Sequence, residues 1–270
     1  MDNFYSEIYS RNIGILSESE QEKLRSSTIA IAGVGGVGGL LAERLVRIGI
    51  GRLKITDPGT FEKSNFNRQF GSSITSLGYN KAEIVFNQIK DINPQAKIDY
   101  STAGIINESD AIRFVSDSDL VIDEMDFGLF RQSISLQRAA RNRGIHYFFT
   151  SAIGFGAMIV IFGPRGLTLE EYDNLPPDVD LNGIEELHVP LERVLPILPS
   201  YIPAATHEAY RTILGRERPG PTISIGVGLA SILAANEAIN IILKKREIAT
   251  APRYTYIDLL DQRFTLGTVP

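Results

Sequence analysis

The feature that most constrains the fold is a glycine-rich segment, GVGGVGG at 33–39, which directly follows the apolar run Thr28–Ala32. The apolar run predicts a buried β-strand, and the residues from about Gly38 to Ile48 have the periodicity of an amphipathic helix. A strand that passes through glycines into a helix typically holds a phosphate, because backbone amides can then approach it closely. The residues expected to contact a nucleotide are Gly33, Gly35, Gly36, Gly38 and, about 20 residues further on, Asp57.

Strands and helices are expected to alternate along the chain as far as Thr150. The expected strands after the first are 53–56, 97–102, 120–123 and 146–150, and the expected helices between them are 81–91, 109–115 and 131–143. This alternation predicts βαβ units, and hence an α/β fold with a Rossmann-like, doubly wound, mostly parallel sheet. Ligands of such sheets bind beyond the carboxyl ends of the strands.

The pattern changes after Ile153, where the chain becomes rich in proline and loses its periodicity. We therefore divide it into three parts. Residues 1–163 are expected to form an N-terminal helical segment and the nucleotide-binding core. Residues 164–222 are expected to form a crossover or cap at the sheet edge that acts on the substrate, and residues 223–270 a helix and strand that complete the core.

Composition excludes several classes of protein. The chain contains no cysteine, so it can form no disulfide, thiolate metal site or cysteine nucleophile. Its net charge is −5, which makes nucleic acid an unlikely partner. The apolar stretch 223–243 is interrupted by Glu237, Asn236 and Asn240, so we expect a buried helix and no membrane span. The first residues show no apolar signal segment, and we expect a cytoplasmic protein.

Polar residues gather in SNFNRQF at 64–70, shortly after the Asp57 turn. An NAD enzyme needs no arginine here unless it binds a 2′-phosphate. An enzyme that orients a triphosphate and stabilises departing pyrophosphate does need a guanidinium and amides at this place. Lys81, at the start of the next expected helix, adds a second positive charge. ATP is therefore favoured over NAD and FAD, which the glycine spacing alone also fits.

Acidic residues follow the fourth expected strand, in DLVIDEMDF at 119–127. Magnesium is usually held by one or two carboxylates together with phosphate oxygens. We therefore expect Asp123 and Asp126 to form a pair of carboxylates that faces the phosphates through Mg²⁺.

Taken together, these motifs resemble the ThiF/MoeB/HesA family, the bacterial relatives of ubiquitin-activating E1 enzymes. The resemblance runs from about Tyr9 to Phe162, with a weaker match in the last helix and strand. The motifs that carry it are GVGGVGG, SNFNRQF, GYNKAE at 78–83, INP at 92–94, DLVIDEMD and TSAIGFG at 150–156. Members bind Mg·ATP and attack its α-phosphate with a carboxylate, which gives an acyl-adenylate and pyrophosphate.

The resemblance implies roles for individual residues. Asn65, Arg68 and Lys81 occupy the family's phosphate-contacting positions, and Gln69 occupies a nucleotide-contacting one. Asp126 matches the aspartate that binds magnesium.

The resemblance also implies a homodimer. Arg11 matches an arginine that reaches across a dimer interface to the ATP of the partner. Because the chain has no cysteine, it can form no cysteine thioester after adenylation. The carboxylate could belong to a peptide, to the C-terminus of a ubiquitin-like carrier, or to a small metabolite.

Two departures from the family pattern leave alternatives open. Gly59 replaces the second acid of a D-x-D motif, and Phe127 replaces the asparagine of a D-N pair. A weak or inactive E1-like subunit that acts as a binding partner is therefore the second hypothesis. An NAD(P)-dependent oxidoreductase, supported only by the glycines and Asp57, is the third.

Overall fold

The computed structural model describes residues 3–181, 189–203, 205–206 and 220–269. Within these residues the helices and strands follow one another in this order: α1 (Asn3–Ile8), η1 (Ser10–Asn12), α2 (Glu18–Ser26), β1 (Thr28–Ala32), α3 (Gly36–Ile48), β2 (Arg52–Thr56), η2 (Lys63–Asn65), η3 (Ile74–Ser76), α4 (Lys81–Ile92), β3 (Lys97–Ser101), α5 (Glu108–Val115), β4 (Leu120–Asp123), α6 (Phe130–Asn142), β5 (His146–Ile153), β6 (Gly156–Phe162), α7 (Leu169–Tyr172), α8 (Leu191–Val194), α10 (Ser224–Leu243), β7 (Arg253–Asp258) and β8 (Arg263–Thr268).

One eight-stranded sheet organises the described residues, in the order β3-β2-β1-β4-β5-β6-β7-β8. The first five strands of this order are parallel, and β6, β7 and β8 continue the sheet in antiparallel pairs. The predicted Rossmann-like, mostly parallel α/β fold is confirmed. β6 remains part of the sheet, since it pairs along its whole length with β5.

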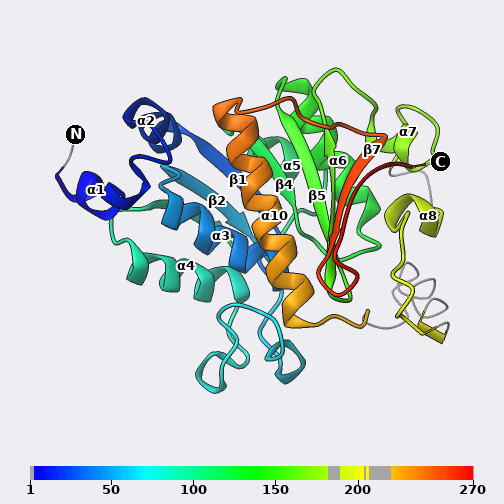
Figure 1. Ribbon diagram of the computed structural model, residues 1–270, viewed down its shortest axis with the longest axis horizontal. Helices are drawn as coiled ribbons and strands as arrows, with labels where there is room; N and C mark the ends of the chain where they lie inside the picture. The colour runs from blue at the N-terminus through cyan, green and yellow to red at the C-terminus, as the bar shows by residue number, and fades with distance from the viewer. Residues whose placement is uncertain (1–2, 182–188, 204, 207–219, 270) are drawn as a thin grey trace.

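Helices cover both faces of the sheet. α10 packs against α3, β5 and β6 on one face, and α5 packs with α6 on the other, where α6 also contacts β4 and β5. Figure 1 shows α10 lying across the front of the sheet beside α3. The arrangement is doubly wound, so each face of the central strands is buried and the strands are apolar almost throughout.

α10 is the one helix in the described part of the chain that is long and apolar enough to cross a membrane. Half of its most apolar window is buried inside the fold. Ala230, Ala234 and Ala238 are fully buried against the sheet, as expected of a core helix. The interior of the fold thus explains the hydropathy of this segment.

The chain reverses its direction of strand addition at β1. From β1 it adds β2 and β3 on one side and then returns to add β4 and β5 on the other. The crevice at such a reversal, beyond the carboxyl ends of the strands, is where doubly wound sheets bind ligands. The loops that follow β1, β2 and β4 meet at this edge.

Candidate functional site

The glycine loop after β1 is fixed by close backbone packing. Gly33 has a φ of +87°, and a Cβ added to it would lie 2.3 Å from the Glu124 carbonyl oxygen. A Cβ on Gly38 would lie 2.0 Å from the Gly33 carbonyl oxygen. Only glycine therefore allows the loop after β1, the start of α3 and the loop after β4 to approach this closely. The positions of the first and third motif glycines follow from packing alone.

The N-terminus of α3 has no side-chain cap. Its N-cap residue is Gly35, which has no side chain that could accept a hydrogen bond from the helix amides. The first amides of a helix lack intrahelical partners and carry a partial positive charge, so an uncapped N-terminus at a sheet edge suits a phosphate. Gly35 and Gly36 leave the approach to these amides free of side chains.

Asp57 supports the glycine loop from β2. Its carboxylate accepts hydrogen bonds from Val34 N at 2.9 Å and from Gly59 N at 2.8 Å. Burial raises the pKa of this carboxyl, while the hydrogen bond from Gly59 and the charge of Lys81 act in the opposite direction. Asp57 therefore braces two loops, and both of its oxygens are already bonded to backbone amides.

The residues of the SNFNRQF segment lie around the start of α3. The Arg68 side chain passes Gly36, and its Nη1 donates to Ser64 O and to Asn67 Oδ1, both at 2.9 Å. Gln69 lies next to Gly35, with its Oε1 buried and without a hydrogen-bond partner among the described residues. A buried, unpaired amide oxygen beside an uncapped helix N-terminus is an arrangement that a bound ligand would complete.

Asn65 has a different environment from its neighbours. It is buried, and its Oδ1 accepts a hydrogen bond from Glu62 N at 3.0 Å within a capping box around η2. Its Oδ1 therefore holds the loop in shape, while its Nδ2 group makes a long hydrogen bond of 3.5 Å to Ser64 Oγ.

Positive and negative side chains meet between β2 and β4. The Lys81 Nζ lies close to Gly59, and the charges of Lys81 and Asp126 both act on Asp57. Burial lowers the pKa of the Arg68 guanidinium, and the nearby charge of Asp126 opposes that shift. The structure thus brings Asp57, Arg68, Lys81 and Asp126 into one neighbourhood.

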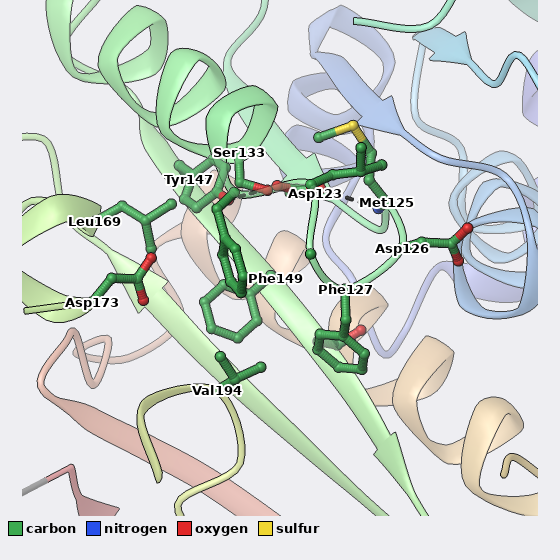
Figure 2. Close-up of a pocket in the computed structure, with 14 residues that line it drawn as sticks. Asp123, Met125, Asp126, Phe127, Ser133, Tyr147, Phe149, Leu169, Asp173 and Val194 are labelled. Atoms are coloured by element: carbon green, nitrogen blue, oxygen red, sulfur yellow. Dashed lines mark hydrogen bonds between the residues drawn. The ribbon is translucent and has the colours of Figure 1, made fainter. Parts of the chain in front are cut away.

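The expected pair of carboxylates after β4 does not form. Asp123 is buried as the last residue of β4, and its carboxylate accepts hydrogen bonds from Tyr147 Oη at 2.7 Å and Met125 N at 3.0 Å. Asp126 is exposed, and Figure 2 shows its carboxylate pointing away from Asp123. The two residues stand in different settings, one in a strand and one in the following loop, so only Asp126 faces the nucleotide crevice.

The residues present fit a nucleotide together with a magnesium ion. Among the described residues, no group of three or more His, Asp or Glu side chains is placed to hold a metal ion. Asp126 would therefore be the protein ligand of an ion at this place. Magnesium bound by one carboxylate and by phosphate oxygens is a common arrangement. Arg68, Lys81 and the α3 amides supply the positive charge that a triphosphate requires.

Arg11 is not brought to this site within one chain. It lies exposed on η1. The residue after it, Asn12, donates a hydrogen bond to Ile48 O at the C-terminal end of α3. The glycine loop is at the other end of this 13-residue helix, about 20 Å away by helix rise.

Three residues near the site were not identified from the sequence. Glu124 lies within the DLVIDEMDF motif, directly after β4, but was given no role there. It accepts a hydrogen bond from Thr150 Oγ1 at 2.6 Å, and burial raises its pKa well above the ordinary range. Tyr147 and Asp173 line a cavity described below. Neither of these two belongs to a motif, and only the tertiary fold places them near the end of β4.

Comparisons with known proteins identify relatives of this chain. The model of the ThiF family matches residues 9–269. The tRNA threonylcarbamoyladenosine dehydratase of Bacillus subtilis (strain 168) is 37% identical over 90 residues, which are 33% of this chain and 35% of that protein. The molybdopterin-synthase adenylyltransferase of Escherichia coli (strain K12) is 28% identical over 176 residues, 60% of this chain and 71% of that protein.

Solved structures show the same fold. The crystal structure of selenomethionine PaaA has a TM-score of 0.72 and 16% identity, and the match covers all of this chain and 75% of PaaA. The E. coli MccB structure with ATP has a TM-score of 0.72 and 18% identity, over 97% of this chain and 70% of MccB. The match to the B. subtilis dehydratase spans about a third of that relative, so activity and substrate are not transferred by similarity alone.

Proposed function

The chain belongs to the ThiF family, and from that premise we propose that it is an enzyme that uses ATP to adenylate a carboxylate. The observation that carries the proposal is that Lys81 and Asp126 act on Asp57, which braces the glycine loop, while Arg68 lies beside the uncapped N-terminus of α3. Positive side chains and free amides at this place suit a triphosphate, whereas a dinucleotide enzyme requires only the glycines and Asp57.

The reaction follows from the charges. A carboxylate oxygen of the substrate attacks the α-phosphorus of ATP, the bond from that phosphorus to the bridging oxygen breaks, and pyrophosphate leaves. Arg68 and Lys81 stabilise the charge that develops on the phosphates, and the α3 amides hold them in line. Asp126 holds magnesium, which neutralises phosphate charge when bound. Attack by the substrate itself requires no protein nucleophile, in keeping with a chain that lacks cysteine.

The substrate we propose is a peptide, with a ubiquitin-like carrier or a small carboxylic acid as other members of the same chemical class. MccB has been solved with the peptide MccA, and that neighbour shares the fold of this chain. The adenylate is proposed to pass to its next acceptor without a cysteine thioester, since the chain contains no cysteine.

Calorimetry and isotope exchange test this proposal on the wild-type chain. We expect Mg·ATP to bind and NAD to show no heat of binding at millimolar concentration. We also expect ATP–pyrophosphate exchange that depends on an added carboxylate from a panel of short peptides and small acids. NAD binding without ATP binding would overturn the proposal in favour of an oxidoreductase.

Binding of ATP without exchange on any carboxylate would favour the second candidate, a subunit that acts with a catalytic partner. Gly59 is the observation behind this candidate. Glycine supplies no second acid at this position. A Cβ there would lie 3.0 Å from the Asp57 carboxylate and 3.4 Å from Lys81 Nζ, so there is little room for a larger side chain.

A homodimer is the second part of the proposal, with Arg11 of one chain serving the site of the other. Since Arg11 and the glycine loop lie at opposite ends of α3, Arg11 is poised to act on another chain rather than on its own.

Mixing two inactive variants tests this exchange of residues. R11A and D126A are each expected to be inactive alone. If subunits redistribute at random, half of the dimers are mixed and each contains one complete site, so about a quarter of wild-type activity should return. No recovery, together with a monomeric mass in solution, would contradict the shared site.

A further inference from the structure

A cavity of about 50 Å³ opens on the other side of the β4 loop from the nucleotide crevice. Its lining runs from Asp126 and Phe127 in this loop, past Phe149 on β5, to Asp173 and Val194 beside the short helices α7 and α8 (Figure 2). Since Asp126 belongs both to this lining and to the proposed magnesium site, the cavity lies next to the place where a carboxylate would meet ATP.

Asp173 is the unusual group in this cavity. The residue is 3% exposed, and its carboxylate has no hydrogen-bond partner among the described residues. Burial raises its pKa from 3.8 to about 8, with a further increase from the charge of Glu170 and a decrease from that of Arg193. Buried carboxyl groups are normally paired, so an unpaired one that lines a cavity indicates a missing partner.

The other walls leave Asp173 as the free polar group. Both oxygens of Asp123 are used, one by Tyr147 Oη and one by Met125 N. The rest of the lining is largely apolar, and it includes the aromatic rings of Phe127, Phe149 and Tyr147 (Figure 2). Aromatic faces attract organic cations.

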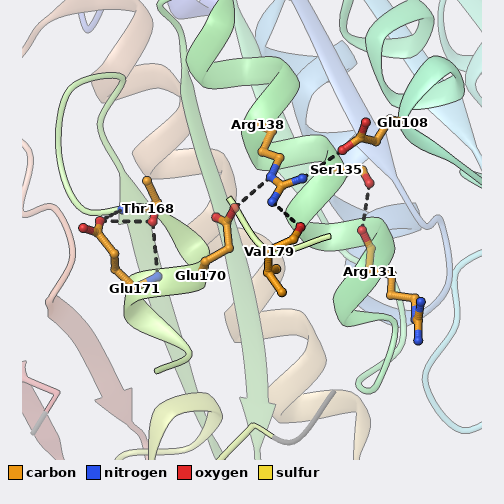
Figure 3. Close-up of polar contacts among 8 residues, drawn as sticks. All are labelled: Glu108, Arg131, Ser135, Arg138, Thr168, Glu170, Glu171 and Val179. Carbon is orange, nitrogen blue, oxygen red and sulfur yellow. Dashed lines mark hydrogen bonds and ion pairs between the residues drawn. The ribbon is translucent and has the colours of Figure 1, made fainter. Parts of the chain in front are cut away.

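A network of ion pairs holds the helix that carries Asp173. Arg138 on α6 donates to Glu170 Oε1 at 2.7 Å, to Val179 O at 2.8 Å and to Glu108 Oε1 at 2.9 Å (Figure 3). Thr168 and Glu171 form a capping box that starts α7. These contacts join α7 to the core, and the Asp173 backbone N donates to Leu169 O at 2.8 Å, so Asp173 is held at the end of a helix anchored on α6.

We propose that this cavity receives a positively charged group of the substrate, an ammonium or a guanidinium, while the carboxylate to be adenylated lies at the Asp126 end. The inference rests on the proposed function and names the class of substrate for that site. An organic cation fits better than a metal ion, because Asp173 is the one carboxylate in the described lining of the cavity that is both buried and free to bind. A cation would pair with Asp173 and lie against the aromatic walls.

The cavity can be tested without catalysis. Melting temperature is measured at pH 8 with n-butylammonium chloride, n-butanol and sodium chloride at equal concentrations. At about ten times its dissociation constant the ammonium should raise the melting temperature of the wild type by about 3 °C, and n-butanol should not. D173N should lose this response. D178N, which removes an exposed carboxylate from the same region, should keep it. Equal shifts in wild type and D173N would overturn the proposal.

The substrate class is tested by exchange with matched peptides. Acetylated tripeptides that end in lysine, norleucine, glutamine or glutamate are compared in ATP–pyrophosphate exchange. The lysine peptide should exceed norleucine by at least about tenfold in kcat/KM, the size of one well-paired charge, and D173N should abolish this preference while it retains exchange with norleucine. A glutamine preference equal to that for lysine would overturn recognition of a cation.

The two failures are distinguishable. Exchange with no preference for a cationic peptide leaves the adenylation function standing and removes the cation pocket. A melting shift that depends on Asp173, without exchange on any peptide, retains the pocket and removes the adenylation function.

Discussion

Replacing Asp126 or Arg68 with alanine is expected to lower the rate of carboxylate-dependent ATP–pyrophosphate exchange by about 10³-fold, or about 4 kcal/mol of transition-state stabilisation. Asp126 is the exposed carboxylate that faces the crevice, and Arg68 is half-buried beside Gly36, within reach of the charge of Asp126. Neither side chain packs in the core, so both variants should fold with an unchanged melting temperature.

The two variants should differ in their dependence on magnesium. D126A should need a much higher concentration of magnesium for half-maximal exchange, because the protein ligand is lost and the phosphates remain. R68A should keep the wild-type magnesium dependence and lose rate at every concentration.

Matched controls come from exposed residues outside the site. R165A removes an exposed arginine and D178N an exposed aspartate, and both should exchange at the wild-type rate. Wild-type rates in D126A would show that Asp126 is not the magnesium ligand. Wild-type rates in R68A would remove the guanidinium from the phosphate site.

Sequence patterns predicted the nucleotide half of the molecule well, because local rules determine it. The strands at Thr28–Ala32 and Leu120–Asp123 have the predicted bounds, and the apolar stretch 223–243 forms the helix Ser224–Leu243. The glycine spacing reports backbone packing that no other residue allows, and this is why it could be interpreted from the sequence.

The other half could not be predicted in this way. The strand β8 was missed, although Phe264 and Leu266 alternate with polar residues as edge strands do. Asp123 was assigned to the wrong surface because sequence position shows that a residue follows a strand but not which way it points. Asp173 follows a four-residue helix in a proline-rich region, and tertiary contacts such as the burial of Tyr172 and the ion pair of Arg138 with Glu170 bring it near β4.

Replacing Asp173 with asparagine is expected to stabilise the fold, increasingly so as the pH rises. The pKa of Asp173 is about 8 in the folded chain, against 3.8 for an aspartate in solvent. A carboxyl whose pKa is raised by folding binds its proton more tightly in the folded state, so stability is fully present below pH 3.8 and is lost as the pH rises towards 8.

The size of the effect follows from the same values. Each pKa unit corresponds to 1.36 kcal/mol, so the ionised carboxyl should cost the wild type about 6 kcal/mol above pH 8. D173N carries an isosteric amide that does not ionise. Its advantage in the free energy of unfolding should therefore be small at pH 4 and approach about 6 kcal/mol at pH 9.

Urea unfolding at pH 4, 7 and 9 measures this difference, since all other titrating groups are common to both chains and cancel. D178N has the same change of charge on an exposed aspartate and should follow the wild type within about 0.5 kcal/mol at each pH. A flat difference between D173N and wild type would mean that Asp173 is solvated or paired in the folded chain.

If D173N both stabilises the fold and loses recognition of a cation, then the acid at position 173 serves binding and not stability. Stability is commonly lost where a site must keep an unpaired polar group ready for its ligand. Bound to a cationic substrate, Asp173 would ionise and form an ion pair, and the cost of its burial would then be offset by the partner. The wild type should accordingly regain stability at pH 9 when n-butylammonium is added, and D173N should not. The same salt would thus narrow the difference in stability that pH creates between the wild type and D173N, which no purely structural role of Asp173 would produce.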